Sequence, residues 1–204
     1  MPEMLFRTPE TEHDRDNKLR IVFAVPIAAE WGEVMQERFD FRFMQGFGGT
    51  EPSIVCYTNL DDPLLPGMAG RVRHDLYEVR VVDSKTDIPV PQGELGEIVV
   101  RPKLPFVFSQ GYFRMPEATV ESWRNLWYHT GDAGYFDAED RLYFADRIKD
   151  RIRRRGENIS SYEVEQVVND YPNVAESAVV GVRVEGAGGE DEVKACIVTD
   201  SGKT

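Results

Sequence analysis

The sequence predicts a mixed α/β (α+β) fold in which an α/β unit precedes a β subdomain and a small α+β unit. Three observations predict it. A strand–helix–strand pattern occupies residues 18–55, short strands and turns occupy residues 68–148, and a helix followed by two apolar strands occupies residues 149–204. The change from strand-rich to helix-then-strand sequence predicts a domain boundary at Lys149, which separates residues 1–148 from the rest.

Length and composition restrict the class of protein. The chain has 204 residues, enough for one or two domains, and its net charge of −12 argues against a nucleic-acid or anionic-membrane binder. No apolar run approaches the ~20 residues that span a bilayer, and the first residues lack a signal-peptide core. Cys56 and Cys196 are too few for a disulfide framework, so both thiols are expected to be buried in a cytoplasmic protein.

The first unit begins with a β-branched run at 19–25, which predicts a buried parallel strand. A helix is expected over 28–39, where apolar residues recur at helical spacing: Trp31, Val34, Met35 and Phe39. A second strand at 41–45 leads into a glycine-rich loop at 46–51. Ligands of such units bind at the carboxyl ends of strands, where this loop lies.

The middle of the chain reads as antiparallel β structure. Strands are expected at 77–82 and 97–100, because turn residues and no helical stripe separate them. A short helix at 116–123 carries proline in its first turn, and a hairpin joins 135–136 to 142–145.

The last unit begins with a helix that ends near Asp170 and is capped by Ser160 or Ser161. Apolar strands are expected at 175–183 and 193–199.

One glycine-rich string combines groups suited to a nucleotide: Gly46, Phe47, Gly48, Gly49, Thr50 and Glu51. Its glycines allow a ligand to approach the backbone closely, and Phe47 offers an aromatic face to a base. Thr50 offers a hydroxyl and an N–H to a phosphate, and Glu51 offers an oxygen ligand for Mg²⁺. The alternative is a tight turn followed by an exposed acid.

A second string, His129-Thr130-Gly131-Asp132, places an acid after a glycine. Asp132 can accept both hydroxyls of a ribose, or it can serve a helix cap or an Asx-turn. His129 has no nucleophile or acid at triad spacing, so a packed or hydrogen-bonded role is expected. Arg147 follows the hairpin and can reach the same ribose or a phosphate.

A basic run interrupts the acidic chain at Arg147, Lys149, Arg151, Arg153, Arg154 and Arg155, against the single acid Asp150. It is either a solvated charged face or an anion site. The neighbouring motifs favour the anion site.

The order of these strings resembles the adenylate-forming superfamily, which includes acyl-CoA synthetases, luciferases and peptide-synthetase adenylation domains. The matching motifs lie at 47–51, 128–132, 146–150 and 156–159, with further matches at 93–98 and 111–113. The resemblance covers residues 18–200 and is greatest to the crotonobetaine/carnitine-CoA ligase branch.

The resemblance implies that residues 1–148 are the C-terminal part of a large AMP-binding domain and residues 149–204 the truncated start of a small one. Thr50 and Glu51 would be catalytic, with Glu51 holding Mg²⁺. The implied nucleotide contacts are Gly46, Phe47, Gly48, Gly49, Thr50, Asp132, Phe144 and Arg147. Phe47 and Phe144 would flank adenine, and Asp132 and Arg147 would hold the ribose.

The resemblance also implies a role for the basic run. Lys149 would be the hinge about which the small domain turns between two half-reactions. Gly156 would leave room for the pantetheine arm of coenzyme A, and Arg155 and Glu157 would contribute to its site.

By this resemblance, the chain is part of an ATP-dependent ligase of the kind found in fatty acid metabolism. It would activate a carboxylic acid as acyl-AMP and transfer it to coenzyme A. Alternatives are a non-catalytic nucleotide-binding or interaction module, and an adenylating enzyme that loads a carrier protein. The chain departs from the family at 23–26, where glycines usually lie beside adenine. The family's upstream phosphate loop and C-terminal catalytic lysine are not recognisable, and an unpaired strand edge near Ile21 makes a homodimer possible.

Overall fold

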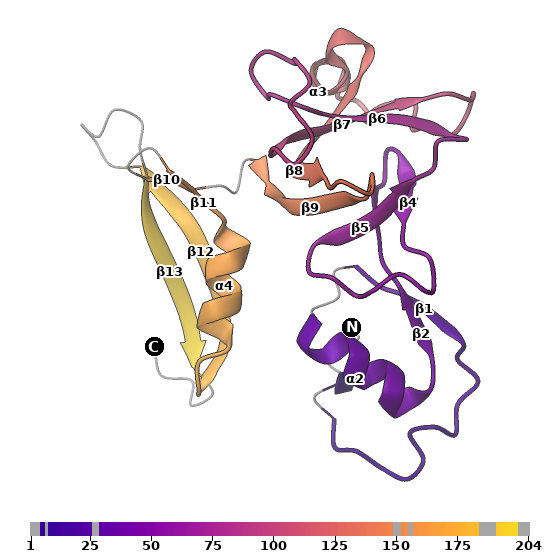
Figure 1. Ribbon diagram of the computed structural model, residues 1–204. Helices are drawn as coiled ribbons and strands as arrows, with labels where there is room; N and C mark the ends of the chain where they lie inside the picture. The colour runs from indigo at the N-terminus through magenta and orange to yellow at the C-terminus, as the bar shows by residue number, and fades with distance from the viewer. Residues whose placement is uncertain are drawn as a thin grey trace. The chain divides into compact units, whose positions relative to one another are not determined.

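A computed structural model describes residues 5–6, 8–25, 29–148, 152–154, 157–183 and 191–199. The chain forms two compact units (Figure 1). The first comprises Met1–Thr130 and Gly134–Phe144, and the second comprises Gly131–Ala133 and Ala145–Thr204. The fold is mixed α/β, as the sequence predicts, with a large antiparallel sheet and few helices. The predicted boundary residue, Lys149, lies outside the described residues.

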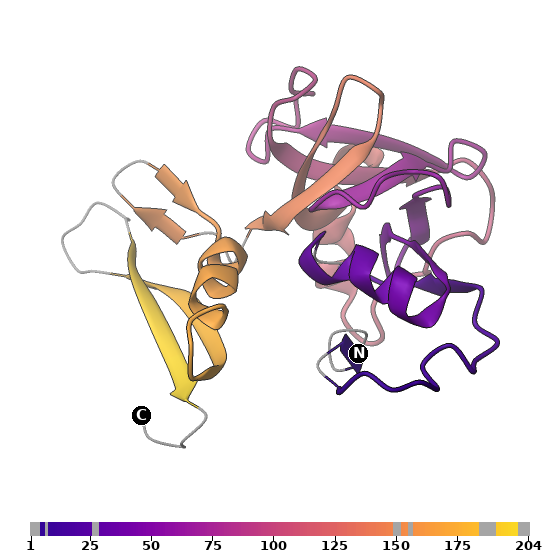
Figure 2. The ribbon, with the colours of Figure 1, turned by 60° about the horizontal axis from the view of Figure 1, so that its bottom comes forward.

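The first unit opens with the expected strand–helix–strand element, but the prediction that its first strand is buried is wrong, because Ile21 and Phe23 are each 46% exposed. Strand β1 (Ile21–Phe23) pairs in parallel with β2 (Arg42–Met44), and helix α2 (Ala29–Phe39) connects them. Figures 1 and 2 show the helix beside this strand pair. Met35 and Phe39 are buried between helix and strands, whereas Val34 is 43% exposed. The buried apolar face of the helix is therefore narrower than the sequence predicts.

A seven-stranded sheet forms the body of the fold, in the order β3-β4-β5-β9-β8-β7-β6. Its strands are β3 (Gly46–Gly49), β4 (Ser53–Tyr57), β5 (Met68–Val72), β6 (Tyr77–Val82), β7 (Gly96–Pro102), β8 (Tyr128–Phe136) and β9 (Leu142–Arg147). The pairs with a described register are antiparallel. Helix α3 (Pro116–Ser122) and a 3₁₀ turn (Arg124–Leu126) lie between β7 and β8. The predicted helix and hairpin are confirmed.

The glycine string is a strand where the sequence predicts a loop. Gly46–Gly49 forms β3, which pairs with β4 from Gly46↔Tyr57 to Gly49↔Ser53, with a bulge at Phe47/Gly48. The string therefore lies inside the sheet, and only Thr50 and Glu51 belong to the turn that follows. The sequence could not show this pairing, because it depends on a neighbouring strand rather than on local composition.

The second unit contains two antiparallel hairpins and one helix. Strand β10 (Ile152–Arg154) pairs with β11 (Glu157–Ile159), and β12 (Val174–Arg183) pairs with β13 (Asp191–Thr199). Helix α4 (Ser161–Asn169) lies along β12 (Figure 1). Of the two predicted caps, Ser160 is correct, because its hydroxyl accepts a hydrogen bond from the N–H of Glu163 at 3.2 Å.

The two cysteines differ in environment. Cys56 on β4 is fully buried, and burial raises the pKa of its thiol to about 12. Cys196 on β13 is exposed, so the prediction that both thiols are buried is wrong for Cys196. Both faces of β13 are largely exposed, which the apolar sequence of this strand does not reveal.

Close backbone packing at Gly70 on β5 gives a stability prediction. Gly70 has φ +94°, and a Cβ there would lie 2.2 Å from the carbonyl carbon of Tyr57. Gly93 has a similar φ of +86°, with nothing within 4 Å of the same position. We expect Gly70→Ala to lower the free energy of unfolding by about 1–3 kcal/mol more than Gly93→Ala, because only Gly70 adds a clash to the strained φ. Urea denaturation measures both, and equal losses would contradict the packing at β5.

The cysteine environments predict a difference in reactivity. Thiolates react with aromatic disulfides, and a buried thiol with a raised pKa supplies none. We expect the folded chain at pH 8 to react rapidly through Cys196 alone, and a second equivalent to appear only in denaturant. Cys196→Ser should abolish the fast phase and Cys56→Ser should leave it unchanged. Two fast equivalents in the folded chain would show that Cys56 is accessible.

Candidate functional site

Strand β3 runs from the core to the surface: Gly46 and Phe47 are buried, whereas Gly48 and Gly49 are exposed. A Cβ on Gly46 would lie 2.7 Å from the carbonyl oxygen of Cys56, and a Cβ on Gly48 would lie 2.0 Å from the carbonyl oxygen of Ser53. Either contact is too close for any other residue. The glycines are therefore required by packing, whether or not a ligand approaches them.

Phe47 lies between these glycines and belongs to the core of the sheet. Its side chain is 7% exposed, and its ring stacks on that of Phe144 with the centroids 6.2 Å apart. The structure thus brings together the two aromatic residues that the resemblance assigns to adenine. Their partnership already explains both as core residues, so the adenine role stays a prediction.

A cavity of about 270 Å³ lies beside β3. Its lining residues are Phe23, Val25, Gly46, Phe47, Gly48, Gly49, Ser53 and Ile54. Phe23 and Val25 are 46% and 58% exposed, so the apolar wall of this cavity is accessible. The cavity is partly apolar and bordered by backbone, which are general properties of small-molecule sites.

The turn after β3 holds Thr50 and Glu51. Thr50 is exposed and Glu51 is partly buried. The Tyr112 hydroxyl donates to Oε1 of Glu51 at 2.7 Å, and the N–H of Ser109 donates to the Glu51 carbonyl at 2.8 Å. The carboxylate is therefore held by a segment about 60 residues further along the chain.

The second unit contains the predicted ribose pair. Asp132 on β8 is 8% exposed, and its Oδ1 lies 3.3 Å from Nε of Arg147 on β9. The Arg147 side chain is 57% exposed and its backbone N–H donates to Asp146. Gly131 has φ +71°, a conformation that favours glycine before the acid. The structure thus pairs these two residues, and their ribose role stays a prediction.

His129 is a buried, hydrogen-bonded side chain, as the sequence predicts. Its Nδ1 lies 3.0 Å from Oε2 of Glu97, which also lies 3.3 Å from Nη2 of Arg124. Its Nε2 lies 3.9 Å from a carboxylate oxygen of Asp87. The histidine therefore joins β8 to β7 and to the turn around Asp87, a structural role that requires no substrate.

Two tyrosines near Glu51 were missed by sequence analysis. The hydroxyls of Tyr112 and Tyr128 lie 3.3 Å apart, and burial is the main cause that raises the pKa of each phenol. Both phenols are therefore neutral donors at physiological pH. The signal was present, because Tyr112 lies in the 111–113 motif and Tyr128 opens the 128–132 motif, but neither was tied to Glu51.

The coenzyme A residues fall largely outside the described chain. Lys149, Arg155 and Gly156 lie outside the described residues, and only the backbone of Glu157 is described, paired with Arg154 across β10 and β11. Nε of Arg154 lies 2.8 Å from Oε2 of Glu192. Arg154, one of the basic residues of the predicted anion site, therefore already has an acidic partner.

The described residues contain no group of three or more histidine, cysteine, aspartate or glutamate side chains suited to a metal ion. A Mg²⁺ that travels with a nucleotide needs only one or two carboxylates, because phosphates and water supply the other ligands. Glu51 fits that smaller requirement. Among the described helices, none is long and apolar enough to cross a membrane.

Comparison with known proteins identifies the family. The family described as "AMP-binding enzyme" matches residues 1–113, more than half of the chain. The chain belongs to the AMP-binding enzyme family. The resemblance to adenylate-forming enzymes that its motifs predicted is thereby confirmed.

Curated relatives and solved structures agree with this family. Crotonobetaine/carnitine–CoA ligase of Salmonella typhi is 34% identical over 98% of the chain. ATP-bound MatB from Rhodopseudomonas palustris is 30% identical with a TM-score of 0.75 over 99% of the chain. O-succinylbenzoate coenzyme A synthetase from Bacillus subtilis, in complex with ATP and magnesium ion, is 28% identical with a TM-score of 0.77 over 98% of the chain. The chain spans about 40% of the length of each.

Proposed function

We propose that this AMP-binding family chain is part of an ATP-dependent carboxylate–CoA ligase, and that it carries the nucleotide-binding part of that activity. The observation that carries the proposal is the glycine strand β3, which borders an accessible cavity and ends in Thr50 and Glu51. This arrangement offers backbone, hydroxyl and carboxylate groups within a few residues. The names of the relatives as CoA ligases support the same reaction.

The residues of the first unit would serve the base and phosphates. The base would enter the cavity beside β3, where Gly48 and Gly49 expose the backbone and Phe23 and Phe47 supply apolar walls. The exposed hydroxyl and N–H of Thr50 suit a phosphate oxygen, since both are hydrogen-bond donors.

Asp132 and Arg147 would serve the ribose. An ionised carboxylate accepts two hydroxyl hydrogen bonds, and such charge-assisted bonds are the stronger kind. Nε of Arg147 lies 3.3 Å from Oδ1 of Asp132, so the two side chains could contact the same ribose.

The reaction requires electrostatic stabilisation. A carboxylate is a poor acyl donor because its leaving group would be oxide, so its oxygen attacks the α-phosphate of ATP, forming acyl-AMP and releasing pyrophosphate. The thiol of coenzyme A then attacks the acyl carbon, loses its proton and displaces AMP. Mg²⁺ bound by Glu51 and the phosphates would neutralise charge on the phosphate oxygens.

Two further roles follow from the family and extend the proposal. Lys149 would be the hinge between the two half-reactions, and Arg155, Gly156 and Glu157 would contact coenzyme A. A carrier protein bears the same pantetheine arm as coenzyme A, so product analysis with each thiol separates these acceptors.

Nucleotide binding by the chain itself tests the proposal. We expect calorimetric titration to show saturable binding of AMP and of Mg-ATP, and Asp132→Ala to weaken AMP binding about 10–100-fold by removing charge-assisted hydrogen bonds. Asp61→Ala is the matched control, because it removes the same carboxylate from a side chain that is 97% exposed and lies outside the motifs.

The outcomes separate three conclusions. Binding by the unsubstituted chain and by Asp61→Ala, but weakly by Asp132→Ala, supports the proposal. Equal binding by all three removes the role of Asp132. No binding by the unsubstituted chain overturns the proposal that this chain carries a working nucleotide site.

A further inference from the structure

Glu51 is held in place by a part of the chain that the nucleotide motifs do not include. Tyr112 donates its hydroxyl to Oε1 of Glu51 at 2.7 Å and comes from the segment before helix α3. A glutamate at an exposed turn would otherwise sample several rotamers. Ordering a flexible side chain on binding costs roughly 0.5–1.5 kcal/mol, so a carboxylate that is already ordered binds its ligand more tightly.

The segment that carries Tyr112 is itself fixed to the turn after β3. Tyr77 donates its hydroxyl to the carbonyls of Pro52 and Val107, at 2.5 and 3.1 Å. The N–H of Ser109 donates to the Glu51 carbonyl at 2.8 Å. Together with the hydrogen bond from Tyr112 to Glu51, these contacts hold the turn that carries Glu51 and the segment that carries Tyr112.

The backbone of Tyr112 is anchored from its other side by helix α3. Its N–H donates to Oγ1 of Thr119 at 2.9 Å, and the same hydroxyl donates to the Met115 carbonyl at 3.0 Å. A Cβ on Gly111 would lie 2.7 Å from Cγ2 of Thr119, so the chain approaches the helix closely at this point. The phenol has little freedom to leave Glu51.

The Tyr128 hydroxyl lies next to that of Tyr112. The Tyr128 ring lies in an aromatic cluster, 5.1 Å from the ring of Phe108 and 5.7 Å from that of Trp123, and its hydroxyl lies 3.3 Å from that of Tyr112. A phenol O–H donates a hydrogen bond to a carboxylate oxygen, so this arrangement orients the Glu51 side chain.

We propose that Tyr112, supported by Tyr128, is a positioning residue that holds the Glu51 carboxylate ready for the Mg²⁺ of a bound nucleotide. This inference rests on the proposed function. Tyr112 does not touch the metal in this proposal. It acts by restricting Glu51 to one orientation through the hydrogen bond from its hydroxyl to Oε1.

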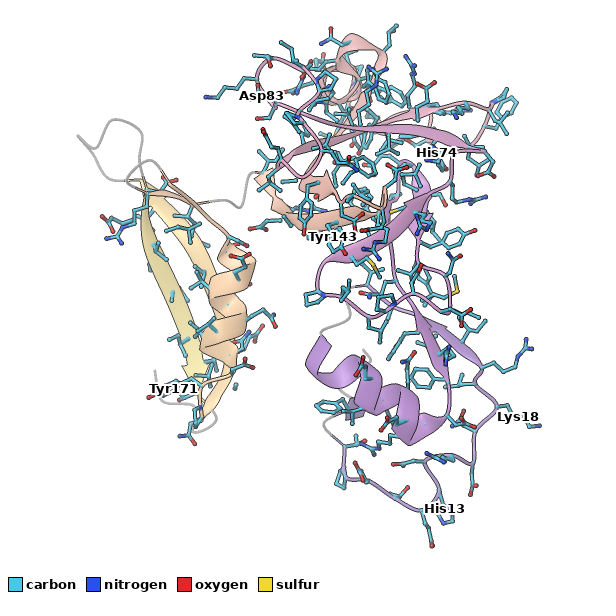
Figure 3. All side chains as sticks on the ribbon, viewed as in Figure 1. His13, Lys18, His74, Asp83, Tyr143 and Tyr171 are labelled. Carbon is cyan, nitrogen blue, oxygen red and sulfur yellow. The ribbon has the colours of Figure 1, made fainter. Side chains whose placement is uncertain are left out.

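The measured quantity is the factor by which Mg²⁺ tightens ATP binding, obtained by titrating ATP calorimetrically in saturating Mg²⁺ and in EDTA. We expect Tyr112→Phe to reduce this factor about 3–10-fold, the range for one hydrogen bond to a charged group, and to leave ATP binding in EDTA unchanged. Tyr128→Phe should give a smaller reduction. The matched control is Tyr171→Phe, which removes the same atom from a 73% exposed side chain beyond α4 (Figure 3).

A double-mutant cycle with Glu51→Gln separates positioning from a general structural effect. If Tyr112 acts through Glu51, adding Tyr112→Phe to Glu51→Gln produces no further loss of Mg²⁺ dependence. Additive losses, or an equal loss of binding in EDTA, would overturn the positioning role. Near-ultraviolet circular dichroism checks folding. If Tyr112→Phe does not fold, the same cycle with Tyr128→Phe decides.

Failure of the inference and failure of the proposed function give different results. If the unsubstituted chain binds ATP with a Mg²⁺ factor that Tyr112→Phe leaves unchanged, the positioning role is wrong and the nucleotide site remains. If it binds ATP without any Mg²⁺ factor, both Glu51 as a metal ligand and Tyr112 as its positioner are wrong. If it binds no ATP at all, the proposed function itself fails.

Discussion

The close approach of β3 to the backbone of β4 is the constraint on which the candidate site depends. Gly46 and Gly48 approach the carbonyl oxygens of Cys56 and Ser53 at distances that leave no room for a Cβ, while Phe47 between them enters the core of the sheet. The same packing that stabilises the sheet therefore leaves bare backbone beside the cavity. A larger residue at either glycine would move β3 away from β4 and remove the wall of the site.

The backbone geometry of the turn after β3 depends on this packing. Because Phe47 fixes the strand and Tyr77 fixes Pro52, the intervening Thr50 and Glu51 begin from a defined backbone. Tyr112 then restricts the one side chain in the turn that carries charge. Hydrogen bonds and ring contacts within the first unit thus connect the core of the sheet to the Glu51 carboxylate and restrict its position.

Local sequence predicted the elements whose signals are local. Ser160, the proline at the start of α3 and the apolar strands each act within a few residues, and the structure contains the elements they predicted. Features that depend on contacts between distant parts of the chain could not be predicted. The pairing of β3 with β4, the exposure of Cys196 and the bond from Tyr112 to Glu51 depend on which distant segments meet. Of the candidate site, motif order predicted the family correctly, while the roles of its residues stay predictions and the contacts among them depend on the folded chain.

The burial of Phe47 changes how this chain could recognise a base. With one face of its ring against Phe144 and only 7% of the side chain exposed, Phe47 offers a base far less surface than its motif suggests. Phe23 lines the same cavity and is 46% exposed, at a position where the sequence departs from the glycines usual in the family. A base in this cavity would meet an aromatic side chain from β1 and backbone from β3. With glycines at 23–26, this wall of the cavity would consist of backbone. Phe23 replaces that backbone wall with an aromatic side chain. The aromatic contact to the base would then come from β1 instead of from β3.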